Sequence, residues 1–155
     1  MRTTIQSAFF VLTLIYSESI LANFDAPTFK DCQATVTTSR KIANLKLTTH
    51  ESRQYASILR HLADKPVNFA GHYILALWGC GAGCVMGGAI DIKSGNVAML
   101  PFTVTNWPLD IMIPLSFKKD SCLLVVQGSR NEKGQGIYYY KFERNRFNLI
   151  KSVDE

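Results

Sequence analysis

The chain has 155 residues and a formal net charge of +5, with 47% hydrophobic and 19% charged residues. This composition excludes a disordered chain, a collagen-like repeat and a coiled coil, and the length leaves room for one domain. Because a chain of this size buries roughly two-thirds of its unfolded surface, it needs no metal to fold. We expect neither a metal nor a cofactor.

The N-terminal segment has the features of a secretory signal peptide. Met1 and Arg2 form a short positive region, and the run Ala8–Tyr16 that follows is largely apolar. A membrane-spanning helix needs roughly 20 apolar residues, so this run is too short to be one. A buried N-terminal helix is the alternative interpretation.

We expect the signal peptide to comprise residues 1–22, with cleavage after Ala22. Cleavage after Ser19 is the alternative, because Ile20 is a less favoured residue at the −3 position than alanine. The mature chain, 23–155, is then a single domain without a transmembrane segment. It is expected in the periplasm or secreted.

The first half of the mature chain predicts two short strands and one helix. The strands are expected at Ala34–Thr38 and Ile42–Leu47. Thr49 is a suitable N-cap for the helix, and Pro66 ends it. Between them, four apolar residues share one helical face at the spacing i, i+3, i+4, i+7: Tyr55, Ile58, Leu59 and Leu62.

The second half is rich in strand patterns. Residues 68–78 are apolar at both alternating sets of positions, which predicts a central strand covered on both faces. A turn is expected at 131–135, and further strands at Val85–Ile92, Val97–Leu100, Cys122–Gln127, Ile137–Phe142 and Phe147–Lys151. The predicted fold class is α+β: an antiparallel β meander of six to eight strands, with one amphipathic helix packed on one face.

Four cysteines in an exported chain indicate disulfides. Four cysteines allow three pairings, and we favour Cys80–Cys84 with Cys32–Cys122. An extended segment would hold Cys80 and Cys84 about 13 Å apart, too far for a bond, but the glycines between them allow the chain to turn back. The sequence leaves the other two pairings open.

The segment Gly79–Gly88 contains five of the ten glycines, which favours a rigid, exposed loop that could present a binding surface. The candidate binding residues are Trp78, Gly79, Gly81, Ala82 and Gly83. A phosphate-binding loop is not supported, since the Gly-Lys-Ser/Thr ending is absent. A zinc site of His72, Cys80 and Cys84 fits no standard spacing. The remaining alternative is nucleophilic catalysis by Cys80 with His72 as base.

The segments FAGHY and WGCGAGC, together with the late hairpin GIYYYKFERNRFNLI, resemble a set of small exported bacterial proteins. Their pattern runs roughly as NFAGHY…WGC-G-x-x-C…D-x-x-x-G. The resemblance covers Asn68–Gly95 and, more loosely, the final hairpin. It implies compartment and fold rather than an activity.

A fainter likeness is to the periplasmic inhibitors of vertebrate lysozymes. Those proteins place a short Cys-to-Cys loop between strands of an antiparallel sheet and plug the enzyme's cleft with it. The segment Cys80–Cys84 occupies the analogous place. The loop here is Gly-Ala-Gly, without the histidine or acid that would meet catalytic carboxylates.

The expected function is therefore that of a non-enzymatic binding protein of the envelope, as an inhibitor or immunity protein acting through the Gly79–Cys84 loop. Lysozymes are basic and would be repelled by a chain of charge +5, so the expected partner is an acidic or neutral toxin or cell-wall enzyme. No nucleic-acid partner is expected, because export removes the chain from nucleic acid. The alternative is a small envelope hydrolase or thiol enzyme that uses His72 and Cys80.

Overall fold

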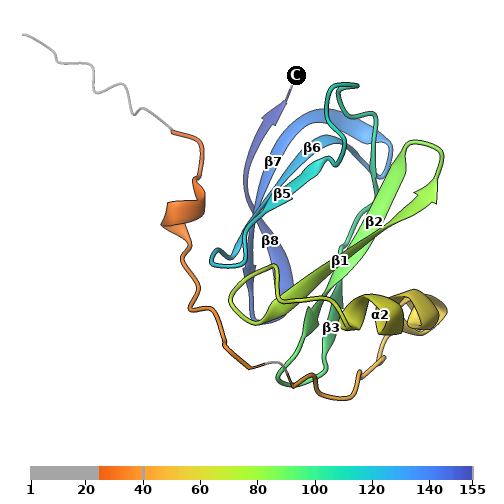
Figure 1. The fold of residues 1–155 in the computed structure, drawn as a ribbon. Coiled ribbons are helices and arrows are strands. Elements are labelled where there is room, and N and C mark those ends of the chain that lie inside the picture. Colours follow the sequence, from red (N-terminus) through yellow and green to blue (C-terminus); the bar gives the residue numbers. More distant parts are fainter. Residues whose placement is uncertain (1–24, 40, 155) are drawn as a thin grey trace, which may run out of the picture.

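The computed structural model describes residues 25–39 and 41–154, and Figure 1 shows their arrangement. The predicted signal peptide and its cleavage site lie outside the described residues. The described part contains a 3₁₀ helix, two α-helices and eight strands: η1 (Phe29–Asp31), α1 (His50–Gln54), α2 (Ala56–Ala63), β1 (Tyr73–Gly81), β2 (Cys84–Asp91), β3 (Val97–Met99), β4 (Val104–Thr105), β5 (Leu115–Phe117), β6 (Leu123–Arg130), β7 (Lys133–Glu143) and β8 (Arg146–Asp154).

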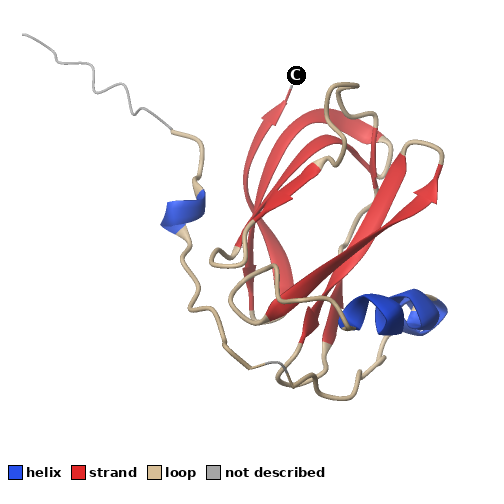
Figure 2. Ribbon diagram, in the orientation of Figure 1, coloured by secondary structure: helices blue, strands red, loops and turns tan. Residues whose placement is uncertain are grey.

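All eight strands belong to one antiparallel sheet. Its order is β1-β2-β4-β6-β7-β8, with β3 beside β2 and β5 beside β6. The sheet curls, so that β1 and β2 face β5–β8 across the interior, as Figure 2 shows. The Tyr73 hydroxyl donates a hydrogen bond of 3.0 Å to Asn145 Oδ1, which joins the start of β1 to the β7–β8 turn. The α+β class and the strand number predicted from the sequence are confirmed.

The apolar residues form two cores on opposite faces of β1 and β2. The interior core fills the curled sheet and includes Phe69, Leu75, Val126 and Tyr138. The second core lies beneath α2 and comprises Leu59, Ala63, Ile74, Ala76, Trp78, Met86, Ile90 and Ile92. Alternation along β1 sends Leu75 inward and its neighbours outward to the helix, which is why both sets of positions are apolar.

The prediction of a central strand at 68–78 is right about its two covered faces and wrong about its position. β1 begins at Tyr73 and, among the described strands, pairs only with β2, so it is an edge strand of the sheet. The Asn68 side chain accepts a bond of 2.7 Å from the Leu75 amide and donates one of 3.2 Å to the Leu75 carbonyl. A side chain, rather than another strand, therefore satisfies β1 at this point. Just before β1, Ala70 and Gly71 have positive φ and turn the chain.

The predicted helix is present but interrupted at Tyr55. Its N-cap is Thr49, as expected: the Ser52 amide donates to Thr49 Oγ1 at 3.0 Å. Tyr55 leaves helical geometry, with φ −98° and ψ 22°. The centre of its ring lies 5.3 Å from the centre of the Trp78 ring. Leu59 is fully buried against the sheet, so the apolar stripe is core packing.

The strands expected at Ala34–Thr38 and Ile42–Leu47 are absent from the described residues. Both segments instead make separate backbone hydrogen bonds to the rest of the chain. The Thr37 amide donates to the Gly71 carbonyl at 2.8 Å, and the Lys46 amide donates to the Gly95 carbonyl at 2.8 Å. Isolated bonds of this kind build no ladder. The segments instead cover the sheet's connections.

The late hairpins are tighter than expected. Asn131 and Glu132 alone form the β6–β7 turn, so β7 starts within the turn predicted at 131–135. Both residues have positive φ, at 51° and 62°, as a two-residue type I′ turn requires. This turn matches the twist of the flanking strands and lets them pair up to its edge.

The favoured disulfide pairing is confirmed. Cys80 bonds to Cys84 and Cys32 bonds to Cys122, with Cα–Cα distances of 5.1 and 5.3 Å. The long-range bridge attaches the N-terminal segment to the start of β6, where the Cys122 amide also donates to the Cys32 carbonyl.

Candidate functional site

The hairpin that joins β1 and β2 ends in an exposed, cross-linked tip. Gly79 pairs with Val85 and Gly81 with Cys84, which leaves Cys80 as a bulge in β1. Ala82 and Gly83 make the turn, and residues 79–83 are all exposed. Gly81 and Gly83 have φ of 140° and 61°, which glycine adopts without a steric penalty. The backbone pairing and the Cys80–Cys84 bond hold this tip in one shape.

Trp78, placed by the sequence among the binding residues of this loop, is not part of the exposed tip. Its side chain is 9% exposed and belongs to the core beneath α2. Position 78 falls on the face of β1 that packs against the helix, so the ring contacts Tyr55. Its indole Nε1 is buried and has no hydrogen-bond partner among the residues that the structure describes.

A second exposed segment, the 106–114 loop, connects β4 to β5 and is anchored at both ends. Trp107 packs against the interior core, and Pro114 is fully buried. Asn106 takes φ 51°, and the Gln127 amide donates to the Pro114 carbonyl at 2.9 Å. The middle of the loop therefore projects from a fixed base.

The projecting part carries large apolar side chains in solvent. Leu109 is fully exposed, Met112 is 94% exposed and Ile113 is 57% exposed. Grouped apolar side chains on one exposed loop are unusual on a monomer and mark interaction sites. Sequence reasoning missed them because Pro108 and Pro114 merely indicated an irregular stretch. The detectable signal was the apolar run Ile111–Ile113 in a segment that cannot pair as a strand.

The two exposed segments lie at the same end of the molecule. Thr105, where the loop leaves β4, is the direct β-sheet partner of Cys84, where the hairpin tip returns into β2. Figure 1 shows the tip and the loop at the same, upper end of the molecule. We call the hairpin tip 79–84 and the 106–114 loop together the apical surface.

The structure does not bring His72 and Cys80 together. They lie at opposite ends of β1, and the eight steps along the chain from one Cα atom to the other span roughly 26 Å. Cys80 is bonded to Cys84, and no described cysteine is free. The nucleophile and base of the alternative enzyme are therefore not assembled.

His72 instead lies beside Asp91. Its Nε2 is 3.7 Å from Asp91 Oδ1, and its ring is 4.4 Å from the Tyr73 ring. Burial lowers the pKa of His72, while the Asp91 carboxylate opposes this effect. Asp91 also accepts hydrogen bonds from the Lys93 amide and the Ser94 hydroxyl, so it orders the β2–β3 turn.

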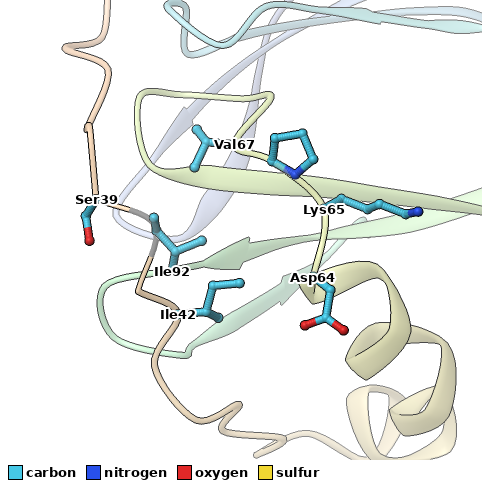
Figure 3. A pocket seen from close by; sticks show the side chains of 7 residues that line it. Ser39, Ile42, Asp64, Lys65, Val67 and Ile92 are labelled. Atoms are coloured by element: carbon cyan, nitrogen blue, oxygen red, sulfur yellow. The ribbon is translucent and has the colours of Figure 1, made fainter.

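A small hollow lies at the other end of the molecule, where the extended segment near Ile42 passes the end of α2 (Figure 3). Its volume is about 200 Å³, and Ile42, Val67 and Ile92 form its apolar wall. Lys65 extends away from these residues. The hollow is smaller than usual small-molecule sites.

Within the described ranges, no three His, Cys, Asp or Glu residues gather in a group that could hold a metal ion. No helix in that part of the chain is long and apolar enough to cross a membrane. Comparison of the chain with family models, with curated proteins and with solved structures finds no match.

Proposed function

We propose that this protein is an exported, non-enzymatic binding protein that contacts a protein partner through the apical surface. The observation that carries the proposal is the pairing of a cross-linked, exposed hairpin tip with a firmly anchored loop of exposed apolar side chains. Leu109 and Met112 lie almost wholly in solvent. Their burial against a partner would contribute about 1.5–3 kcal/mol for each side chain.

Rigidity supports this role. A surface that is already ordered loses little conformational entropy on binding, so more of the contact energy appears as affinity. The tip is held by the Cys80–Cys84 bond and by pairing with β2, and the loop by Trp107 and Pro114. The likeness of the Cys80–Cys84 segment to the plug loops of lysozyme inhibitors points in the same direction.

The expected partner is an acidic or neutral protein of the envelope, such as a toxin or cell-wall enzyme that this protein inhibits. The net charge of +5 favours encounter with an acidic surface and disfavours a basic enzyme. The apical surface would then supply the apolar contacts at the centre of the interface. The proposal covers both an inhibitor and an immunity protein, because each would bind such an enzyme and block it.

The experiment is capture of partners with matched baits. The mature protein is immobilised and exposed to envelope and toxin extracts, in parallel with Leu109→Ser/Met112→Ser and Ala82→Arg. A true partner is retained by the wild type, lost with both apical variants, and forms a stoichiometric complex when purified. Its own enzymatic activity is then measured with and without this protein.

The control bait is Val36→Ser. It removes an exposed apolar side chain that lies more than 40 residues before the hairpin tip in the sequence and is not part of the apical surface. It should retain the same partner as the wild type. If all four baits retain the same proteins, or if none retains any, the proposed binding surface is wrong.

A further inference from the structure

A second concave site lies on the far side of β4 from the hairpin tip, at the β6–β7 turn. Val104 pairs with Arg130, so β4 separates this site from Cys84 and the apical surface. The cavity has a volume of about 380 Å³. Its lining residues are Pro101, Phe102, Arg130, Asn131, Lys133, Tyr140, Phe147 and Leu149.

Arg130 is held in place by two aromatic residues of β7. Its guanidinium carbon lies 3.6 Å from the centre of the Tyr138 ring, and its Nη1 donates a hydrogen bond to the Tyr140 hydroxyl. Burial by itself lowers the pKa of Arg130, but the contacts with Tyr140 and Tyr138 outweigh it and the pKa is raised. The guanidinium is therefore charged and preorganised.

The cavity carries positive charge without a matching acid. Arg130 and Lys133 are direct partners across the type I′ turn, where like charges destabilise the pair. No carboxylate of the described residues lies within 4.0 Å of either side-chain nitrogen, and none lines the cavity. Glu132 lies in the turn between them but is exposed to solvent. An anion in the cavity would remove this repulsion.

An apolar wall continues from the cationic end. Phe147 and Leu149 of β8 line it, and Leu149 is 47% exposed although it faces the concave side. Pro101 and Phe147 also line an adjoining groove of about 500 Å³, which runs past β3 and the start of β8. A ligand with an anionic head at Arg130 could therefore lay an apolar body along Phe147.

We propose that this cavity binds an amphiphilic oxyanion, a carboxylate or phosphate group joined to an apolar chain, with its head between Arg130 and Lys133. The planar guanidinium matches the paired oxygens of either head group. Lys133 adds a second charge, and Phe147 and Leu149 contact the chain. The site lies across β4 from Cys84, and none of its lining residues belongs to the apical surface.

The test titrates the isotope-labelled mature protein, with both disulfides intact, with hexanoate and with hexyl phosphate. The readouts are NMR shifts of the Arg130 Nε–H and of the Asn131 and Leu149 amides. Saturable shifts at these positions are expected with at least one of the two, and the better one identifies the head group. Inorganic phosphate and hexanol, which present the head and the chain alone, should bind at least tenfold more weakly.

The variants separate a binding role from a structural one. Arg130→Lys keeps the charge but loses the planar pair of N–H donors. The dissociation constant of the better-binding amphiphile should therefore rise roughly tenfold or more. Lys133→Gln, at an exposed position that does not endanger folding, should raise it roughly two- to fivefold. Arg60→Lys makes the matched change on the exposed face of α2 and should leave the constant unchanged.

Several outcomes would overturn the proposal. These are the absence of saturable shifts with both amphiphiles, equal binding of hexanol, or equal binding of inorganic phosphate. Shifts confined to Leu109–Ile113 would move binding to the apical surface instead. Unchanged affinity in Lys133→Gln together with Arg130→Lys would also refute it.

Discussion

The guanidinium carbon of Arg130 lies 3.6 Å from the centre of the Tyr138 ring. Tyr138 is 1% exposed, so this charged side chain closes one end of the interior core, and Arg130 also lines the cavity at the β6–β7 turn. Stacking on an aromatic face lets arginine cover apolar surface and remain charged. The same contact orients the group that we propose binds an anion.

The hydroxyl of Tyr140 should contribute to stability through Arg130. Tyr140→Phe keeps the ring, which packs 4.9 Å from Phe102, but removes the acceptor of the Arg130 hydrogen bond. A donor left without its partner costs about 1–3 kcal/mol. We expect the free energy of unfolding, measured in urea, to fall by that amount.

Tyr139→Phe is the matched control. Tyr139 lies on the opposite face of β7, and its hydroxyl makes no hydrogen bond to the described residues. Its loss should change stability by less than about 0.5 kcal/mol. Equal effects of the two substitutions would show that the Arg130–Tyr140 bond adds nothing.

The two disulfides should differ in their effect on stability. Cys32–Cys122 closes a loop with a sequence separation of 90, and Cys80–Cys84 one of 4. In the chain-entropy model, these bridges stabilise the fold by about 4–5 and about 2 kcal/mol. The double serine variants of each pair should therefore lower the urea midpoint to different extents, with the long-range pair causing the larger loss. The reverse order would contradict the model for this protein.

Gly71 should not tolerate a side chain. It has φ +82°, and an added Cβ would lie 2.4 Å from the Thr35 carbonyl oxygen. Gly71→Ala combines left-handed backbone strain with a backbone clash, and we expect a loss of about 3 kcal/mol or more. Gly83 also has positive φ, but nothing lies within 4 Å of a Cβ added there. Gly83→Ala should therefore lower the free energy of unfolding by only about 1–2 kcal/mol. Similar losses in the two variants would refute the clash at Gly71.

Stability should fall in mild acid because of His72. Burial lowers its pKa in the folded chain below the ordinary 6.5, despite the opposing charge of Asp91. The unfolded chain therefore takes up the proton first. The stability present above pH 6.5 is lost as the pH falls through the folded pKa. NMR titration should give a His72 midpoint below 6.5.

His72→Gln should remove this part of the pH dependence of the urea midpoint. His61→Gln, at an exposed position of α2, should leave it unchanged. A His72 midpoint at or above 6.5 would mean that attraction to Asp91 exceeds the effect of burial.

Local patterns were enough to predict much of this fold. Three of the predicted features depend only on neighbouring residues, and the structure contains them all: the N-cap Thr49, the apolar stripe around Leu59 and the alternation along β1. The favoured cysteine pairing also holds, because glycines between Cys80 and Cys84 allow the chain to reverse. The turn at Asn131 was predicted as well, although two residues suffice where five were expected.

Only the tertiary structure decided the position of β1, the burial of Trp78 and the two candidate surfaces. Apolar residues at both alternating sets of positions show that a strand has two covered faces, but not whether another strand pairs at its edge. Likewise, Arg130 meets Tyr138 and Tyr140 because β6 and β7 pair in one register, and the 106–114 loop starts beside the hairpin tip because Thr105 pairs with Cys84. Contacts between distant segments depend on how the sheet pairs and curls, whereas local propensity acts within a few residues.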